Sequence, residues 1–414
     1  MTDVSKPKIA IIGGGAAGLM AAATLLESGK PCEVHVFEKN KGLGAKVLIS
    51  GGGRCNVTTG LTNRQQLMKK YTRGATFLKA AMSKLPPQKT YEWFETHGVP
   101  LKIEEDLRVF PVSDNGQDIV GVFERLFAKH KAHVHLLTSV TSIQKQGEHF
   151  VVGTSKGEMR FDKVIITTGG SAYRHTGSTG DGYAFAVAMG HTITKLGPSL
   201  NSFVIRETWP KELSGISLPN ARLKHQKTAV SGPLLFTHFG ISGPATFSFS
   251  SQIAYEPISE VQPMKVQLFF DAEKSFEDWE AYFIDRAKQH PKKNVATLLA
   301  MLFPKRLVAA MLSQAKVKDT TVIGQLEKDE RKAVSHAMAG GTVLTLIQRR
   351  PGDEFVTAGG VSTDEINPQT MESRITPGLY FAGEVMDVDG LTGGFNLQAS
   401  WATGQLAAKS IIKR

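Results

Sequence analysis

Between residues 8 and 39 a strand, a glycine-rich turn, a helix and a second strand follow one another. The apolar run KIAIIGG is typical of a buried parallel strand. The glycines after it have the spacing G-x-G-x-x-G, at Gly13, Gly15 and Gly18. A helix of small residues follows, and EVHVFE then alternates up to Glu38. With 41 glycines in 414 residues the spacing alone proves little, so the flanking strand and helix carry the prediction of a dinucleotide-binding unit.

Each of these glycines has a physical role in such a unit. Gly13 allows the tight turn, Gly15 lets a pyrophosphate approach the backbone, and Gly18 lets the helix pack on the strand. The helix N-terminus offers N–H groups and the positive end of a dipole to phosphates. Glu38, at the end of the second strand, is expected to accept hydrogen bonds from ribose hydroxyls.

The same region could also be interpreted as a targeting segment. From Ile9 to Leu26 the chain has 18 residues without a charge, which resembles a signal peptide or a short membrane span. Three consecutive glycines in its middle are unfavourable in a helix interior, and a strand follows directly. We therefore expect no membrane segment here or elsewhere.

The two cysteines, Cys32 and Cys55, form no C-x-x-C pair. This excludes a disulfide framework, argues against a dithiol redox site and fits a reducing cytoplasm, where we expect the protein to be located.

The net charge of +11 raises the question of a nucleic-acid partner. Between Asp271 and Ser335 there are 12 Lys and Arg against 10 Asp and Glu, a surplus of only 2. On this count we expect a solvated basic surface that is compatible with anionic ligands, and no nucleic acid as partner.

Glycine-rich turns recur after strand-like runs at residues 13–18, 169–182 and 383–394. This predicts one long ligand bound by a domain that both ends of the chain build together. The segment SGGGRCNV, residues 50–57, adds three consecutive glycines. They fit either a surface loop or a backbone against which a large flat group lies.

Several segments closely resemble one branch of the two-dinucleotide-binding-domain flavoproteins, the YhiN/BaiN-type, aminoacetone-oxidase-like family. They are GGGAAGLMAA, GLGAKVLISGGGRCNVT, GSTGDGY, LFTHFGISGPA, TAGGV and GLYFAGEVMDVDGLTGGFNLQ. A more distant resemblance is to the flavoprotein subunits of fumarate reductase. The resemblance spans nearly the whole chain and implies noncovalent FAD.

The resemblance also implies an α/β fold with three domains. The expected Rossmann-like FAD-binding domain is formed by both chain ends, residues 1–192 and 353–414. An inserted β-rich domain covers 193–272 and 340–352, and a small helical domain covers 273–339.

In this family the loop after the ribose-binding acid passes beside the flavin, which gives the three glycines their interpretation as a flavin wall. Val140 is implied to hold the adenine through its backbone, and residues 168–170 to pass the adenosine. Gly383 and Glu384 stand where a Gly-Asp pair usually meets the ribityl chain. The implied cofactor-binding residues are Gly13, Gly15, Ala16, Ala17, Gly18, Glu38, Lys39, Lys46, Ser50, Gly51, Gly53, Arg54, Cys55, Asn56, Val140, Thr168, Gly169, Gly170, Gly383, Glu384, Gly394, Phe395, Asn396 and Leu397.

Within the glycine loop, Arg54 could neutralise a phosphate or a reduced flavin, and Asn56 can donate and accept hydrogen bonds. Cys55 lacks a resolving partner, so we expect a small buried packing residue. At residues 394–397 the N-terminus of the last helix could stabilise negative charge at flavin N1/O2.

The catalytic residues are not identified by the sequence. His238 could donate a proton or bind substrate, and Asp387 or Asp389 could face the ring, although a structural role is favoured for each. No histidine for covalent flavin attachment is present in LISGGGRCN, and no fumarate-reductase catalytic set can be placed.

The sequence therefore predicts an FAD-dependent oxidoreductase that transfers hydride between a small-molecule substrate and the flavin. No second G-x-G-x-x-G indicates a nicotinamide domain, so NAD(P)H as electron donor is compatible but unsupported. An FAD-dependent RNA-modifying enzyme and a non-catalytic flavin sensor or scaffold are the alternatives. The oligomeric state is left open.

Overall fold

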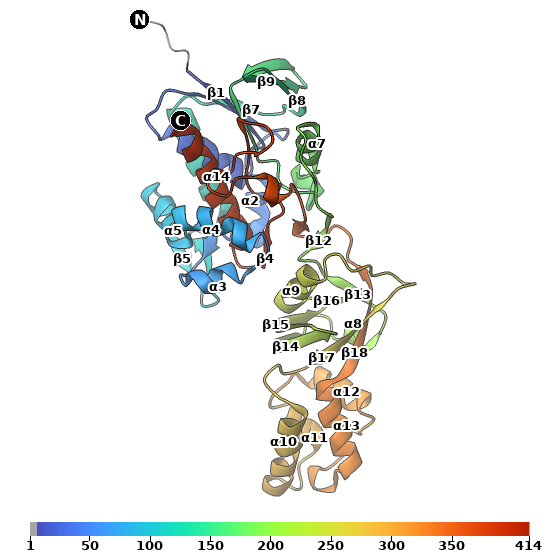
Figure 1. Cartoon of the computed structure of the whole chain (residues 1–414). Coiled ribbons are helices and arrows are strands. Elements are labelled where there is room, and N and C mark those ends of the chain that lie inside the picture. Colours follow the sequence, from blue (N-terminus) through green and yellow to red (C-terminus); the bar gives the residue numbers. More distant parts are fainter. Residues whose placement is uncertain (1–5, 414) are drawn as a thin grey trace, which may run out of the picture. The chain divides into compact units, whose positions relative to one another are not determined.

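The computed structural model describes residues 6–413, and the chain divides into two compact units (Figure 1). The first contains the residues up to Pro198 and from Phe355 onward, and the second is Ser199–Glu354. The first unit therefore combines both ends of the chain.

A five-stranded parallel sheet in the order β20-β11-β1-β2-β7 is the centre of the first unit. Its strands are β1 (Lys8–Ile12), β2 (Glu33–Phe37), β7 (His133–His135), β11 (Lys163–Ile166) and β20 (Leu379–Phe381). The apolar run of β1 is buried because strands pair with it on both sides. Since β20 comes from the C-terminal part, the expected Rossmann-like α/β domain built from both chain ends is confirmed.

Helices α1 (Ala16–Leu26), α6 (Gly116–Lys129) and α14 (Phe395–Ile412) pack around this core, with α1 in contact with both of the others. Gly404 permits the close approach of α14, because a Cβ there would lie 2.3 Å from the Ala17 carbonyl oxygen. The other helices of the unit are α2 (Ala45–Ile49), α3 (Arg64–Met68), α4 (Ala75–Lys84), α5 (Pro87–Thr96) and α7 (Asp181–Ala188).

Smaller sheets surround the first unit's core. One contains β8 (Val140–Gln146), β9 (His149–Thr154) and β10 (Gly157–Phe161), and another contains β3 (Thr58–Thr59), β5 (Leu101–Ile103) and β6 (Arg108–Pro111). Two pairs complete the set: β4 (Tyr71–Arg73) with β21 (Asp389–Gly390), and β12 (Gly197–Ser199) with β19 (Val356–Ala358).

The second unit contains a closed barrel in the order β13-β16-β15-β14-β17-β18. Its strands are β13 (Phe203–Ile205), β14 (Ser217–His225), β15 (Thr228–Phe236), β16 (Gly240–Ser242), β17 (Met264–Phe269) and β18 (Ala339–Arg349). Its helices are α8 (Trp209–Glu212), α9 (Pro244–Gln252), α10 (Phe276–Gln289), α11 (Val295–Leu299), α12 (Lys305–Gln314) and α13 (Lys328–Met338).

Barrel and helices of this unit share one hydrophobic core, in which Trp279 of α10 is fully buried. The separation of the insertion into a β-rich and a helical domain stays a prediction, because this core is continuous across the expected boundary.

The uncharged segment from Ile9 to Leu26 forms β1, the glycine turn and α1. No helix among residues 6–413 has the length and apolarity needed to cross a membrane.

Candidate functional site

The predicted glycine turns meet at one edge of the central sheet. Gly13 follows β1, Glu38 follows β2, Thr168 follows β11 and Gly383 follows β20. All four strands are parallel and adjacent, so their carboxyl ends lie along the same edge. Open α/β sheets bind their ligands outside this edge.

The three glycines of the first turn differ in the space around them: Gly13 and Gly18 are closely packed, whereas Gly15 is open. Gly13 has φ +112°, and a Cβ there would lie 2.7 Å from the Thr167 carbonyl oxygen. A Cβ at Gly18 would lie 2.0 Å from the Gly13 carbonyl oxygen, so the helix can pack only with glycine here. A Cβ at Gly15 would have nothing within 4 Å. The backbone at Gly15 thus faces open space, directly before Ala16 and Ala17 of α1.

Glu38 links this turn to the strand that follows it. Its carboxylate accepts hydrogen bonds from the Gly14 N–H at 3.0 Å and the Asn40 N–H at 2.8 Å. Its carbonyl accepts from the Thr138 N–H at 3.0 Å, two residues before Val140 at the start of β8. The structure therefore places Val140 in the same neighbourhood as the ribose-binding candidate.

Lys39 joins this neighbourhood to α7. Its ammonium forms an ion pair with Asp181 at 2.6 Å and also contacts Thr179. Burial acts to raise the pKa of Asp181, but the hydrogen bonds from Lys39 and Thr179 outweigh it, so this pKa is lowered. Lys39 is thus held beside the second glycine turn.

The second turn lies between the first and the third. A Cβ at Gly13 would touch Thr168 at 3.0 Å, and a Cβ at Gly182 of α7 would lie 2.1 Å from the Thr168 hydroxyl. Gly169 has φ +73°. A Cβ at Gly170 would lie 2.8 Å from a carboxylate oxygen of Glu384, so this backbone approaches the third turn closely.

Gly383 and Glu384 lie in the turn after β20, where they contact α1 and α2, the helix that leads into the glycine loop. A Cβ at Gly383 would lie 2.9 Å from that of Ala17. The Glu384 carboxylate accepts from the Thr357 N–H at 2.9 Å and forms an ion pair with Lys46 at 2.8 Å. Thr357, the first residue of the TAGGV segment, was not among the residues predicted to form the site.

The glycine loop, Ser50–Gly53, is a tight turn whose three glycines have φ of +58°, +73° and +90°, outside the geometry of a right-handed helix. A Cβ at Gly51 would lie 2.7 Å from the Phe110 ring, whereas Gly52 and Gly53 have nothing within 4 Å of that position. Ser50 donates to the Val47 carbonyl at 2.8 Å. Two of the three glycines thus expose backbone to open space.

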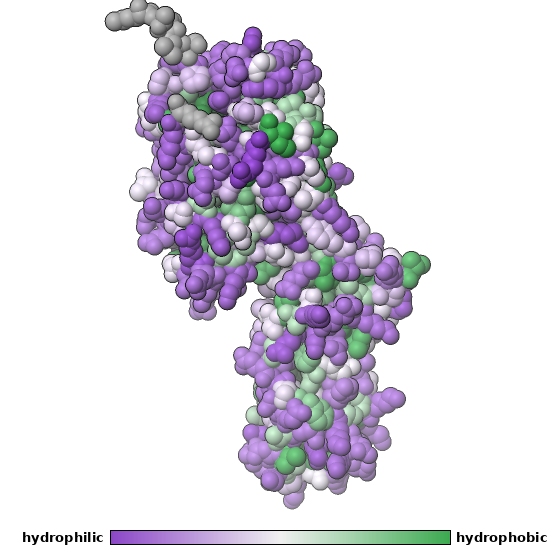
Figure 2. Space-filling model, in the orientation of Figure 1, coloured by the Kyte–Doolittle hydropathy of each residue, from purple (hydrophilic) through white to green (hydrophobic). Residues whose placement is uncertain are grey.

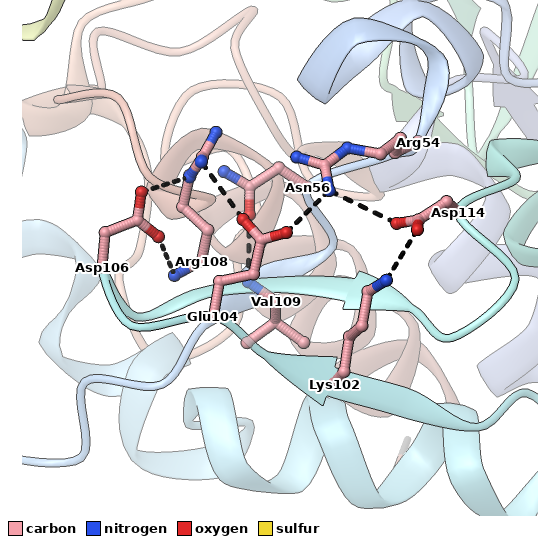
Figure 3. A network of polar contacts seen from close by, with 8 residues as sticks. All are labelled: Arg54, Asn56, Lys102, Glu104, Asp106, Arg108, Val109 and Asp114. Carbon is pink, nitrogen blue, oxygen red and sulfur yellow. Dashed lines mark hydrogen bonds and ion pairs between the residues drawn. The ribbon is translucent and has the colours of Figure 1, made fainter.

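Arg54 belongs to a charged network with residues of β5, β6 and the turns that follow them (Figure 3). Its guanidinium contacts Glu104 at 2.7 Å and Asp114 at 3.3 Å, and it lies 3.8 Å above the centre of the Phe110 ring. The hydrogen bond to Glu104 raises the pKa of Arg54. Two carboxylates thus balance its charge, and neutralisation of a cofactor by Arg54 stays a prediction.

Cys55 is fully buried with φ +63°, and burial raises the pKa of its thiol to about 12. At neutral pH the thiol is therefore protonated and a poor nucleophile. This environment is that of a packing residue.

The Asn56 carboxamide lies between the glycine loop and α14 and can adopt two orientations. In one, its oxygen accepts from the Val109 N–H at 3.3 Å, as Figure 3 shows. In the other, its nitrogen donates to the Thr58 carbonyl at 3.0 Å and its oxygen accepts from the Gly394 N–H at 2.9 Å. The second orientation links the loop directly to the helix N-terminus.

The N-terminus of α14 has no side-chain cap and no acidic residue in its first turn. Gly394 is its N-cap, with φ +87°. Phe395 is buried and its carbonyl accepts from the Tyr71 hydroxyl at 2.8 Å, whereas Leu397 is half-buried. Asn396 holds the preceding turn by exchanging two 2.8 Å hydrogen bonds with the Gly390 backbone.

The three acid–base candidates differ in their surroundings. Asp389 is 1% exposed and its carboxylate accepts hydrogen bonds from Nε and Nη2 of Arg73, which assigns it a structural role. His238 belongs to the second unit, where its side chain is exposed. Asp387 is half-buried, and its Oδ1 is buried without a hydrogen-bond partner among residues 6–413. Only Asp387 thus offers an unpaired polar atom.

The family model described as the HI0933-like protein Rossmann domain matches residues 7–410. The chain belongs to the HI0933-like family. This confirms the YhiN/BaiN-type family that the motifs resemble, and with it an FAD-dependent oxidoreductase.

Three relatives of the HI0933-like protein described here have names that state an activity. A 3-dehydro-bile acid delta(4,6)-reductase of Clostridium scindens is 30% identical over 98% of this chain and 99% of its own. Ribosomal RNA dihydrouridine synthases of Escherichia coli and Haemophilus influenzae are 29% and 32% identical. They cover 97% and 98% of this chain, and the same shares of their own.

Solved structures share the fold of this HI0933-like chain. The 3-ketosteroid delta1-dehydrogenase of Sterolibacterium denitrificans has a TM-score of 0.52 at 13% identity and covers 99% of this chain and 100% of its own. A quinol-fumarate reductase has a TM-score of 0.51 at 12% identity, covering 99% and 71%.

The sheet edge of this HI0933-like protein has room and polar groups for FAD. The backbone is open at Gly15, Gly52 and Gly53. Both α1 and α14 begin without a side-chain cap, so their first N–H groups are available to anionic oxygens. The buried Asp387 oxygen lacks a partner among the described residues. These features fit a dinucleotide whose phosphates and ring bring hydrogen-bonding partners.

The positive charge of the chain is concentrated in one segment, whereas the count over residues 271–335 predicted a basic surface without such a concentration. Residues 39–91 contain eleven Lys and Arg and no Asp or Glu. The rest of the chain balances, because 38 Lys and Arg remain against 38 Asp and Glu. The count over 271–335 missed this segment, and a count along the whole sequence would have found it.

Proposed function

We propose that this protein uses FAD to reduce a carbon–carbon double bond conjugated with a carbonyl group, and that this bond belongs to a uracil base of RNA. The names of the relatives support the reaction class. A 3-dehydro bile acid with 4,6 double bonds has them in conjugation with its oxo group. Dihydrouridine is uridine whose ring double bond, conjugated with a carbonyl, has been reduced.

The reaction adds two hydrogens across the double bond. Reduced FAD, when bound, supplies a hydride for the carbon β to the carbonyl, and a proton adds to the α carbon. The flavin is left oxidised, so each turnover needs a two-electron donor, for which we propose NAD(P)H.

The residues of this chain would hold the cofactor and stabilise charge. The open turn at Gly15 and the start of α1 would bind the pyrophosphate, and Glu38 the ribose. The uncapped start of α14 at Gly394 would stabilise negative charge on the reduced ring, since helix N-termini favour anions. Asp387, with its unpartnered buried oxygen, would hydrogen-bond to the ring or the substrate.

The observation that carries the choice of RNA is the charge of residues 39–91, which equals the whole net charge of +11. A steroid acid carries a single negative charge, whereas RNA presents one per nucleotide. A dense cationic segment therefore favours the polyanion. The motifs alone predict a small-molecule substrate, whereas the relatives named for ribosomal RNA support RNA.

The experiment begins with an anaerobic visible spectrum of the purified protein, followed by NADH and then NADPH. The reduced protein then receives either unmodified ribosomal RNA or a 3-oxo-4,6-diene steroid. We expect RNA to reoxidise the flavin and the digested RNA to contain dihydrouridine by mass spectrometry. Reoxidation by the steroid alone would exclude the RNA substrate, and reoxidation by neither would exclude the reaction class.

A further inference from the structure

The cations of residues 39–91 fall into two sets. Four are half-buried, and each forms an ion pair with a carboxylate. These are Lys39, Lys46, Arg54 and Arg73. The other seven are exposed, and none forms an ion pair with an acidic residue within 6–413. These are Lys41, Arg64, Lys69, Lys70, Lys79, Lys84 and Lys89.

We propose that six of the exposed cations form a docking surface for the phosphate backbone of RNA. This basic face consists of Arg64, Lys69, Lys70, Lys79, Lys84 and Lys89 on and beside α3, α4 and α5. The inference rests on the proposed function, because it places the polyanion that carries the uracil.

Contacts between the helices bring these cations together. The Arg64 guanidinium donates to the Lys79 carbonyl at 3.1 Å, and α3 packs on α4. Helices α4 and α5 both contact α14, which adds the exposed Lys409. Partial burial and then repulsion from Lys89, Lys413 and Lys84 lower the pKa of Lys409. Like charges are thus close enough to repel, and a bound polyanion would relieve this repulsion.

Hydrogen bonds and strand pairing connect the segment that carries the basic face to the turn before α14. The Lys70 carbonyl accepts a hydrogen bond from the Leu391 N–H at 2.8 Å. Strand β4 pairs with β21, and its Tyr71 hydroxyl donates to the Phe395 carbonyl at 2.8 Å. Phosphates held on this face would therefore lie beside the segment that leads to the proposed flavin-binding helix start.

An anionic membrane surface is the other polyanion to consider. Surface-bound helices insert large apolar side chains between the headgroups. Residues 64–96, which contain α3, α4 and α5, include no exposed large apolar side chain. In Figure 2 the side of the first unit that carries α3, α4 and α5 is mostly hydrophilic. The face therefore fits nucleic acid better than lipid.

The test measures binding of oxidised, FAD-loaded protein to a fluorescently labelled, uridine-containing RNA hairpin across a salt series. The variant replaces Lys69, Lys79, Lys84 and Lys89 by Gln. A matched control replaces four exposed lysines of the second unit, Lys292, Lys293, Lys305 and Lys316, by Gln. Both variants lose the same charge, and the flavin spectrum and melting temperature verify that they fold.

We expect the face variant to weaken RNA binding about tenfold to a hundredfold near 0.15 M salt, and to reduce the slope of log K against log salt by about 3. The control should change the affinity less than about threefold. Equal losses in both variants, or wild-type binding without salt dependence, would overturn the proposal. Binding to phosphatidylglycerol vesicles that is lost in the face variant, with RNA binding unchanged, would also overturn it.

Binding without turnover separates this inference from the proposed function. A protein that binds RNA through the basic face but never forms dihydrouridine would retain the docking surface and refute the reaction. A protein that reduces uridine in RNA equally well in both variants would retain the reaction and refute the surface.

Discussion

Lys46 and Glu384 form an ion pair at 2.8 Å although 338 residues separate them in the chain. The pair joins α2, next to the glycine loop, to the turn after β20. Both side chains are largely buried, at 26% and 13% exposure. The second Glu384 oxygen accepts from the Thr357 N–H, so one carboxylate holds three segments of the first unit in place.

Replacement of Glu384 by Gln should lower the free energy of unfolding by about 1.5–3 kcal/mol, the usual range for a hydrogen bond to a charged group. It should also weaken FAD retention, because α2, which leads into the glycine loop, loses its link to the turn after β20. Thermal unfolding and the flavin content after gel filtration measure the two effects. The matched control is Glu260→Gln, which removes the exposed Arg206–Glu260 pair and should cost less than about 1 kcal/mol. Equal effects of the two substitutions would contradict the role assigned to Glu384.

Gly15 and Gly18 should respond differently to alanine. A Cβ at Gly18 would lie 2.0 Å from the Gly13 carbonyl oxygen, so Gly18→Ala must move the helix from the strand and destabilise the fold. A Cβ at Gly15 meets nothing within 4 Å. We therefore expect Gly15→Ala to fold with a melting temperature near that of the parent and to bind FAD at least tenfold more weakly. Tight FAD binding by a well-folded Gly15→Ala would refute the pyrophosphate site.

Cys55 should resist thiol reagents in the native state, because burial raises its pKa to about 12 and the thiolate is the reactive form. Cys32 is only half-buried and should react first. A disulfide reagent at pH 8 should modify one thiol in the folded protein and two in denaturant, and mass spectrometry should locate the first at Cys32. Rapid modification of Cys55 in the folded protein would show that the loop opens.

The raised pKa also makes stability depend on pH on the alkaline side. The unfolded thiol loses its proton near its ordinary pKa of 9.0, while the folded thiol keeps it up to about 12. Stability should therefore fall as the pH rises above 9. Cys55→Ala should show a smaller fall, measured by urea unfolding at pH 8 and pH 10.

The sequence predicted the first unit well because its motifs are local. The spacing of Gly13, Gly15 and Gly18 between a strand and a helix specifies both the turn and its position at a sheet edge. The contribution of β20 to the same sheet followed from the resemblance of the last sixty residues, and parallel pairing with β11 confirms it.

Contacts between distant segments could not be predicted from local patterns. Arg54 follows three glycines, and its ion pairs with Glu104, from the turn between β5 and β6, and with Asp114, from the turn after β6, have no signal in the local sequence. The Thr357 N–H donates to Glu384, a contact between distant segments that the local TAGGV pattern does not indicate. The positive charge of residues 39–91 can be counted directly in the sequence, but the count over residues 271–335 did not include this segment.

The last prediction concerns three histidines on neighbouring strands, His35 of β2 and His133 and His135 of β7. His35 is 3% exposed, stacks on both partners, and contacts His135 at 3.0 Å and Glu33 at 2.8 Å. Burial lowers the pKa of His35, partly opposed by the hydrogen bond to Glu33, and burial likewise lowers the pKa of His135.

The unfolded histidines bind protons near pH 6.5, where the folded ones remain unprotonated because their pKa is lower. The contribution of these histidines to stability should therefore be fully present above pH 7 and be lost as the pH drops below 6.5. His35→Gln should flatten this fall between pH 7 and pH 5 in urea unfolding, whereas the same substitution at the exposed His238 should leave it unchanged.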